Sequence, residues 1–374
     1  MKKKITVLPG DGIGPEVVEQ GLKVIQAING IFEHDFDLKS ADFGAISIDR
    51  HGTPLTDETL EMCLESDAVF LGAIGDPKYD NDPTLPVRPE QGLLKIRKSL
   101  GLFSNIRPIA TYDLLNDVSP LKNHLIENVD LVIYRELTGG IYFGEKKISE
   151  DKTVVSDLCE YSEGEISRIA YQAFEAATNR RNKLTLVDKA NVLETSRLWR
   201  RVIQDISKEY PNVAVDYLFV DNAAMQVMIN PGQFDVVLTE NMFGDIISDL
   251  SSVITGSLGM LPSASVGAKV AMFEPIHGSY PQAKGKDIAN PMATILSVAM
   301  MYEHFGLFQE AEMIKNGVKW ALNNGIATQD IVSGQDQEPS SCSKVGDMVA
   351  WYIEEKGSVS INSESTKLSQ NVII

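Results

Sequence analysis

Short apolar runs alternate along this chain with longer segments that have helical periodicity. Each run is too short for a typical helix and has the right length for a buried strand. The predicted strands are 5–8, 67–72, 130–135, 184–187 and 235–238. Strands that alternate with helices build a sheet covered by helices, so the pattern predicts the α/β class.

Local signals predict where several helices begin. Thr56 precedes two acidic residues and is expected to cap a helix. Ser162 and Glu165 have capping-box spacing at the start of the clearest amphipathic helix. Pro291 is expected to open an apolar helix. From about Gly357 the chain is rich in Ser, Asn, Gln and Lys, which predicts a mobile tail.

Composition narrows the classes of partner. The 374 residues are enough for more than one domain, and the net charge is −18. Such a charge repels nucleic acid and anionic lipid, so neither is expected as a partner. No run of about 18 apolar residues occurs, so no membrane span is expected. The odd, widely spaced Cys63, Cys159 and Cys342 predict reduced thiols in a cytoplasmic protein.

A Gly-rich turn follows the first predicted strand but does not match a dinucleotide-binding loop. After Gly10 and Gly12, Pro15 stands where G-x-G-x-x-G requires its third glycine. Asp11 would also repel a pyrophosphate. Pro15 suits a first helical position, so the pattern predicts a plain strand-to-helix turn in a fold that is not of the Rossmann type.

Arginines and aspartates suggest a site for an anionic substrate and a hard metal ion. Arg88, Arg97 and Arg107 lie within twenty residues, and Arg135 ends a predicted strand. If three such arginines gather, their guanidinium groups suit a dicarboxylate, whereas the alternative is surface arginines paired with acids. Asp245 and Asp249 are four residues apart on one predicted helix face. Oxygen ligands indicate Mg²⁺ or Mn²⁺, although a solvated helix face remains the alternative.

Other candidates follow predicted strands. Lys189 could act as a base if burial lowers its pKa, although a lone lysine is ordinarily a surface cation. Asp221 could supply a third oxygen to the metal. Gly278 and Ser279 could bring backbone amides to a phosphate, and His277 could hydrogen-bond or stack. Together these signals suggest a metal-assisted reaction on a dicarboxylate.

The order of the motifs resembles that of the β-decarboxylating 2-hydroxyacid dehydrogenases, the group that includes the isocitrate and isopropylmalate dehydrogenases. The motifs are LPGDGIGPE, RPE, GLL, SNIRP, RELTGGIYFG, DKANVL, GDIISDL, GSLG and IANP. The resemblance implies two α/β domains with a mixed sheet flanked by helices. It assigns 1–102 with 256–374 to the first domain and 103–255 to the second. It also implies a homodimer with shared active sites and a dimerisation arm within 142–161.

The resemblance assigns roles to individual side chains. Those implied to bind the substrate carboxylates are Arg97, Arg107 and Arg135. Those implied to bind Mg²⁺ or Mn²⁺ are Asp245, Asp249 and Asp221, with Asp221 coming from the partner subunit and also touching the substrate. Those implied to move protons are Lys189, again from the partner subunit, and Tyr142, which protonates the enol.

The resemblance also implies the reaction and its specificity. The expected reaction is oxidation of 3-isopropylmalate by NAD and loss of CO₂, giving 4-methyl-2-oxopentanoate, the precursor of leucine. Leu93 and Leu94 would face the isopropyl group, while Glu90 would repel the third carboxylate of isocitrate. The alternatives are a sister activity on D-malate, tartrate, homoisocitrate or isocitrate, a regulatory subunit, or a dicarboxylate-binding module without turnover.

The residues implied to surround NAD are Glu90, His277, Gly278, Ser279, Gln282 and Asn290. Gln282 stands where many members carry an aspartate that binds the ribose hydroxyls, and glutamine does not repel a 2′-phosphate. The Lys-Tyr pair of NADP-specific isocitrate dehydrogenases is absent there, so NAD is expected. A second departure is Asp76, where another glycine is frequent.

Overall fold

The computed structural model describes residues 1–81, 85–332 and 338–370, which form two compact α/β units. Unit 1 comprises Met1–Ile96, Gly259–Pro262 and Met272–Ile374, and unit 2 comprises Arg97–Leu258 and Ser263–Ala271. The chain therefore begins in unit 1, builds unit 2 and returns. The predicted α/β class is confirmed. The predicted domain limits, 103–255 for the second domain, stay a prediction.

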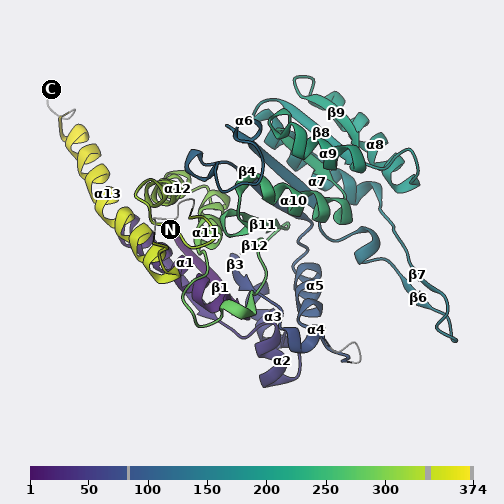
Figure 1. The fold of residues 1–374 in the computed structure, drawn as a ribbon, viewed down its shortest axis with the longest axis horizontal. Helices are drawn as coiled ribbons and strands as arrows, with labels where there is room; N and C mark the ends of the chain where they lie inside the picture. Colours follow the sequence, from purple (N-terminus) through teal and green to yellow (C-terminus); the bar gives the residue numbers. More distant parts are fainter. Residues whose placement is uncertain (82–84, 333–337, 371–374) are drawn as a thin grey trace. The chain divides into compact units, whose positions relative to one another are not determined.

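Unit 1 is built on four strands in the order β2 (Asp35–Ser40), β1 (Lys2–Gly10), β3 (Ala68–Ala73) and β12 (Ala271–Pro275). The central β1 runs parallel to β2 and to β3. Four helices pack together, with α13 along α1 and α12 beside α11 (Figure 1). They are α1 (Gly14–Phe32), α11 (Met292–His304), α12 (Phe308–Asn323) and α13 (Cys342–Gln370). Shorter helices are α2 (Ala45–His51), α3 (Asp57–Leu64), α4 (Pro77–Asp80) and α5 (Pro89–Ser99), whose last residues belong to unit 2.

The Gly-rich turn of unit 1 serves close packing of backbone segments. A Cβ atom on Gly10 would lie 1.9 Å from the carbonyl oxygen of Ala73, and one on Gly12 would lie 1.9 Å from that of Ser279. Both glycines have positive φ, at 73° and 57°, which disfavours other residues. Helix α1 starts directly after them with a proline in its first turn, so the predicted strand-to-helix turn is confirmed.

Asp11 organises this turn through its carboxylate. It accepts backbone N–H groups from Ala45 at 2.8 Å, Ile46 at 2.9 Å and Gly75 at 2.9 Å. Burial raises the pKa of Asp11, and these three donors oppose the shift. Asp11, whose charge is unsuited to a phosphate-binding loop, thus fixes the start of α2 and the loop after β3.

Unit 2 has a mixed set of strands. Their order is β11 (Pro262–Val266), β4 (Ser104–Ala110), β5 (Asp130–Glu136), β10 (Val236–Thr239), β8 (Lys183–Asp188) and β9 (Ala214–Phe219). The last four are mutually parallel, whereas β4 is antiparallel to both of its neighbours. Because parallel strands end at one edge, the residues that end β5, β10 and β8 lie along the same edge.

The helices of unit 2 are α6 (Asn123–Ile126), α7 (Glu163–Thr178), α8 (Glu194–Ile206), α9 (Val220–Ile229) and α10 (Asn241–Thr255). A hairpin of β6 (Lys146–Ile148) and β7 (Val155–Asp157) extends from this unit (Figure 1), and all of its strand residues are exposed. It lies within the segment predicted to be a dimerisation arm. Among the helices that the structure describes, none is both long and apolar enough to span a membrane.

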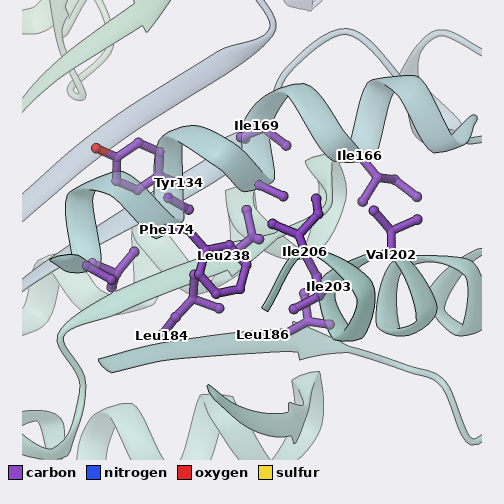
Figure 2. Packing of buried hydrophobic residues seen from close by; sticks show 14 of the residues in the cluster. Tyr134, Ile166, Ile169, Phe174, Leu184, Leu186, Val202, Ile203, Ile206 and Leu238 are labelled. Atoms are coloured by element: carbon purple, nitrogen blue, oxygen red, sulfur yellow. The ribbon is translucent and has the colours of Figure 1, made fainter. Parts of the chain in front are cut away.

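The hydrophobic core of unit 2 lies on one face of its strands. Helices α7 and α8 cover the face to which Tyr134 and Leu186 point (Figure 2). The residues labelled there are Tyr134, Ile166, Ile169, Phe174, Leu184, Leu186, Val202, Ile203, Ile206 and Leu238. Because successive strand residues alternate between faces, Arg135 points to the opposite face, where it contacts α10. The hydrophobic face therefore sets the orientation of the charged one.

Two predicted helix caps are confirmed. The Ser162 hydroxyl accepts the Glu165 N–H, and the Glu165 carboxylate accepts the Ser162 N–H at 2.7 Å, which completes the capping box of α7. Thr56 accepts the Thr59 N–H at the start of α3. Helix α13 continues through the stretch after Gly357 to Gln370, and the mobility expected of this stretch stays a prediction. Ser, Asn, Gln and Lys cost a helix less than about 1 kcal/mol each, so a helix already formed can continue through them.

Replacing Phe174 by alanine tests the core of unit 2. Phe174 is fully buried on α7. We expect Phe174→Ala to lower the free energy of unfolding by about 3–5 kcal/mol, because it removes buried area and leaves a cavity. Urea unfolding followed by circular dichroism measures this loss. The control is Glu175→Ala, at the next, exposed position of α7, which should change stability by no more than about 0.5 kcal/mol. Equal effects of the two variants would contradict the packing described.

Candidate active site

Helix α10 carries the two aspartates that lie four residues apart. The Asp245 side chain is 35% exposed and that of Asp249 is 64% exposed. Both carboxylates approach the guanidinium group of Arg107, with N···O distances of 3.9 Å for Asp245 and 3.1 Å for Asp249. The helix thus presents two carboxylates to one cation, which is a hard-oxygen donor pair of the kind that Mg²⁺ and Mn²⁺ accept.

Two of the three predicted arginines are buried beneath α10. Arg107 on β4 is 8% exposed and Arg135 on β5 is 3% exposed, which excludes a surface role for both. The Arg107 Nη1 donates to the Ser248 hydroxyl at 2.6 Å, and the Arg135 Nη1 donates to the Asp245 carboxylate. These contacts hold β4 and β5 against one helix face.

The arginines influence one another through their charges. Burial lowers the pKa of Arg135 to about 10, and the positive charges of Arg107 and Arg97 add to the effect, while Asp245 opposes it. Repulsion among like charges of this kind is relieved when an anion binds. Arg97, near the end of α5, therefore belongs to the same electrostatic cluster, and the arrangement suits a substrate with two carboxylates.

Tyr142 lies beside the same aspartate. It ends a 3₁₀ turn (Gly140–Tyr142), and its hydroxyl donates to Asp245 Oδ2 at 3.0 Å. Burial raises the pKa of Tyr142, and the charge and hydrogen bond of Asp245 raise it further. The phenol therefore keeps its proton over a wide pH range and can serve as a proton donor.

The loop before Tyr142 is fixed by a buried acid that the sequence did not single out. The fully buried Glu136 carboxylate accepts the N–H groups of Thr138 at 3.1 Å and Gly139 at 2.7 Å. It also pairs with Arg168 at 3.0 Å. The sequence did carry one signal for Glu136. It directly follows Arg135, and because successive residues of β5 point to opposite faces, the two charged side chains cannot share one face.

The side chains of Lys189 and Asp221 contact each other. The Lys189 Nζ donates to Asp221 Oδ1 at 2.5 Å, from the end of β8 to the first turn of α9. This pairing lowers the pKa of Asp221. Within the described ranges, no three His, Cys, Asp or Glu side chains of one chain form a group that could hold a metal. A single chain thus does not join Asp221 to the α10 pair, and a third ligand from a partner stays a prediction.

The residues predicted to surround NAD lie in unit 1. The His277 Nδ1 lies 2.9 Å from the Gly278 carbonyl oxygen, while its Nε2 is buried without a hydrogen-bond partner in the described part of the chain. Burial lowers the pKa of His277, which favours the neutral form of the ring. A buried, unsatisfied ring nitrogen suits a ligand that brings a polar atom to it. Ser279 is buried, and its carbonyl oxygen accepts the Ile13 N–H at 2.8 Å.

Other predicted residues have varied surroundings. Gln282 is exposed in a short 3₁₀ turn (Pro281–Ala283). Asn290 accepts the Met292 N–H at 3.0 Å and donates to Asp330 at 3.1 Å, so it holds the backbone just before α11. The roles of both toward NAD stay predictions.

Helix α5 holds the predicted specificity residues. Glu90 and Leu94 are exposed and Leu93 is half-buried, so all three can meet a ligand. Asp76, the departure from the family pattern, accepts the Lys78 N–H at 3.0 Å and caps α4. That capping hydrogen bond explains, in local structural terms, why an aspartate stands at position 76.

The chain belongs to the isocitrate/isopropylmalate dehydrogenase family, whose model matches residues 4–349. It is 50% identical over 353 residues to the 3-isopropylmalate dehydrogenase of Bacteroides fragilis, covering 94% of this chain and 99% of the relative. It is 48% identical over 342 residues to that of Bacillus subtilis, covering 90% and 93%. The resemblance predicted from the motifs is therefore confirmed.

Solved structures agree. The isocitrate dehydrogenase of Methylococcus capsulatus has a TM-score of 0.83 at 32% identity, covering 94% of this chain and 99% of that one. A β-decarboxylating dehydrogenase of Thermococcus kodakarensis has a TM-score of 0.77 at 33% identity, covering 94% and 96%. The predicted fold, with mixed strands flanked by helices, is that of this family.

Replacing Asp245 by asparagine tests the electrostatics of the site. Because the charge of Asp245 raises the Tyr142 pKa, Asp245→Asn should lower the pH at which this phenol titrates. Ultraviolet difference absorbance isolates its titration when each protein is compared with its Tyr142→Phe counterpart. Asp205→Asn, on the exposed surface of α8, is the matched control and should leave the titration unchanged. A titration midpoint that does not move in Asp245→Asn would contradict the contact.

Proposed function

We propose that this chain is an NAD-dependent 3-isopropylmalate dehydrogenase. It oxidises and decarboxylates (2R,3S)-3-isopropylmalate to 4-methyl-2-oxopentanoate, in leucine biosynthesis in the cytoplasm. The observation that carries the proposal is the buried pair Arg107 and Arg135 beneath the carboxylates of α10, in a chain about half identical to relatives of that name. A dicarboxylate is the ligand that such a pair suits.

The residues of the chain divide the work of binding. Arg97, Arg107 and Arg135 would hold the two carboxylates of the malate moiety and so orient its C2 and C3 atoms. Asp245 and Asp249, with the partner subunit's Asp221, would hold Mg²⁺ or Mn²⁺. The NAD contacts would come from His277, Gly278, Ser279, Gln282, Asn290 and Glu90. When bound, the metal supplies a Lewis acid at the substrate oxygens, and NAD accepts the hydride.

Two side chains would move the protons. Lys189 of the partner subunit would take the proton of the C2 hydroxyl as hydride leaves. Tyr142 would give its proton to C3 after CO₂ departs, and its raised pKa supports a role as the acid. Its hydrogen bond to Asp245 holds the phenol beside the proposed metal ligands.

Residues of α5 would recognise the substituent at C3 of the substrate. Leu93 and Leu94 would contact the isopropyl group, and the exposed Glu90 would repel the third carboxylate of isocitrate. Isocitrate is the second candidate substrate, because a structural relative at 32% identity is an isocitrate dehydrogenase. The acidic residue and two leucines favour isopropylmalate.

Measuring NADH formation tests the function and the need for metal. We expect turnover of 3-isopropylmalate with Mg²⁺ or Mn²⁺ and none in excess EDTA. Asp245→Asn should lower kcat/KM by about a hundredfold or more, because a metal ligand is lost. Isocitrate, D-malate and NADP serve as comparison arms, each expected to give a lower kcat/KM. Full activity in EDTA, or a higher kcat/KM on isocitrate, would contradict the proposal.

Mixing two inactive variants tests the shared site of a homodimer. Lys189→Ala and Asp245→Asn should each be nearly inactive alone. If Lys189 acts in the partner's site, a heterodimer of the two has one site with both lesions and one with neither. Random exchange of equal amounts puts half of the chains in heterodimers, so about a quarter of all sites and of the activity should return. Native mass spectrometry verifies exchange. Exchange without recovery would show that Lys189 acts within its own chain.

A further inference from the structure

We propose that Asn241 is a positioning residue that orients the Arg135 guanidinium for the substrate without neutralising its charge. The inference rests on the proposed function and deepens it, because it concerns how a carboxylate-binding arginine is kept ready. Asn241 is the first residue of α10 and is fully buried. It lies outside the set of residues that the family resemblance assigned to the site.

The contacts of Asn241 leave its amide only one orientation. Its Oδ1 accepts both the Nε of Arg135, at 3.1 Å, and the Nη2, at 2.8 Å. Its Nδ2 donates to the Gly139 carbonyl oxygen at 3.1 Å. The two ends of the amide thus meet a cation and a carbonyl, so a flipped amide would face two donors with a donor.

The same residue ties Arg135 to the loop of the proposed acid. Gly139 directly precedes the 3₁₀ turn that ends at Tyr142. The backbone N–H of Asn241 donates to the Tyr161 hydroxyl at 2.9 Å, which fixes the start of α10. The aliphatic part of Arg135 lies against α10 at Gly244, where a Cβ atom would come within 2.6 Å of the Arg135 Cγ. One amide thus links the cation, the helix and the loop.

The second buried arginine of the site is held in the same way. The Arg107 Nε donates to Asn105 Oδ1 at 2.7 Å. The Asn105 Nδ2 in turn donates to Ser265 at 3.1 Å, so this amide is also fixed. Asn105 is paired in register with Arg135 across β4 and β5, which places the two amide–arginine contacts side by side. Both arginines receive a neutral acceptor at Nε.

Other arginines of unit 2 are held differently. The Arg180 Nε donates to Asp235, which is 1% exposed, and the Arg200 Nε donates to Asp188, which is 2% exposed. The carboxylates that hold these two arginines are thus fully buried. Arg107 and Arg135 also meet carboxylates through their Nη1 atoms, but those of Asp249 and Asp245 are 64% and 35% exposed. An amide accepts the same hydrogen bonds but carries no charge, so it aligns the guanidinium and leaves its electrostatic attraction for another anion. The contrast within one unit supports a functional reason for the amides at Arg107 and Arg135.

Replacing Asn241 by aspartate tests the inference. Aspartate keeps the size and the acceptor of asparagine but adds a negative charge to Arg135. We expect Asn241→Asp to raise the KM for 3-isopropylmalate by about tenfold or more, with the KM for NAD unchanged. It should impair substrate binding at least as much as Asn241→Ala does. Both variants lose the hydrogen bond to the Gly139 carbonyl oxygen. A role limited to holding Arg135 in place predicts the reverse order, since aspartate preserves the contact to Arg135 and alanine does not.

Controls separate binding from folding. Ser251→Ala alters a fully buried residue of the same helix whose hydroxyl donates to the Ile247 carbonyl oxygen, and it should leave both KM values unchanged. Thermal unfolding verifies that each variant is folded. If Asn241→Asp does not fold, Asn105→Asp puts the same question to Arg107, with the same rise in KM expected.

The outcomes distinguish this inference from the proposed function. A wild-type enzyme that turns over 3-isopropylmalate, with a folded aspartate variant of unchanged KM, overturns the inference alone. The same holds if the alanine variant has the larger KM. A wild-type protein that neither binds nor oxidises any of the malates tested overturns both. A selective rise in the KM for the dicarboxylate in the aspartate variant supports the assignment.

Discussion

Burial of two guanidinium groups is the constraint on which the site of unit 2 depends. Removing a guanidinium from water costs several kcal/mol unless its donors find acceptors. Arg107 and Arg135 meet this demand with amide, hydroxyl and carboxylate oxygens from β4 and α10. The order of the strands is essential, because β4 and β5 must be neighbours for both arginines to lie beneath the same helix.

The hydrophobic core sets the direction in which these arginines point. Tyr134 packs with α7 and α8, so the next residue, Arg135, faces α10. On β4, Ile106 packs against the same core while Arg107 points to Ser248. Apolar and charged residues thus alternate along both strands, and the packing of one face determines the geometry of the other.

Local features of this molecule could be predicted from the sequence, whereas long-range pairings could not. The caps of Thr56 and Ser162 depend on residues three positions away, and both were predicted correctly. The amide that holds Arg135 belongs to Asn241, over a hundred positions later, and no local pattern identifies it. Asp11 shows the same limit, since the sequence indicated only that it would repel a phosphate, while its partner Gly75 is far along the chain.

Long-range electrostatics oppose the proposed substrate, so recognition depends on short-range contacts. The chain carries a net charge of −18, which repels a dianion, but salt screens charges beyond about 8 Å at physiological ionic strength. At contact distance the arginine cluster dominates. Asp245 contacts Arg135 and Tyr142 and is also a proposed metal ligand. A cation on Asp245 would weaken its attraction for Arg135 and leave that guanidinium for a substrate carboxylate. Charge balance at one aspartate therefore links the proposed metal and substrate sites.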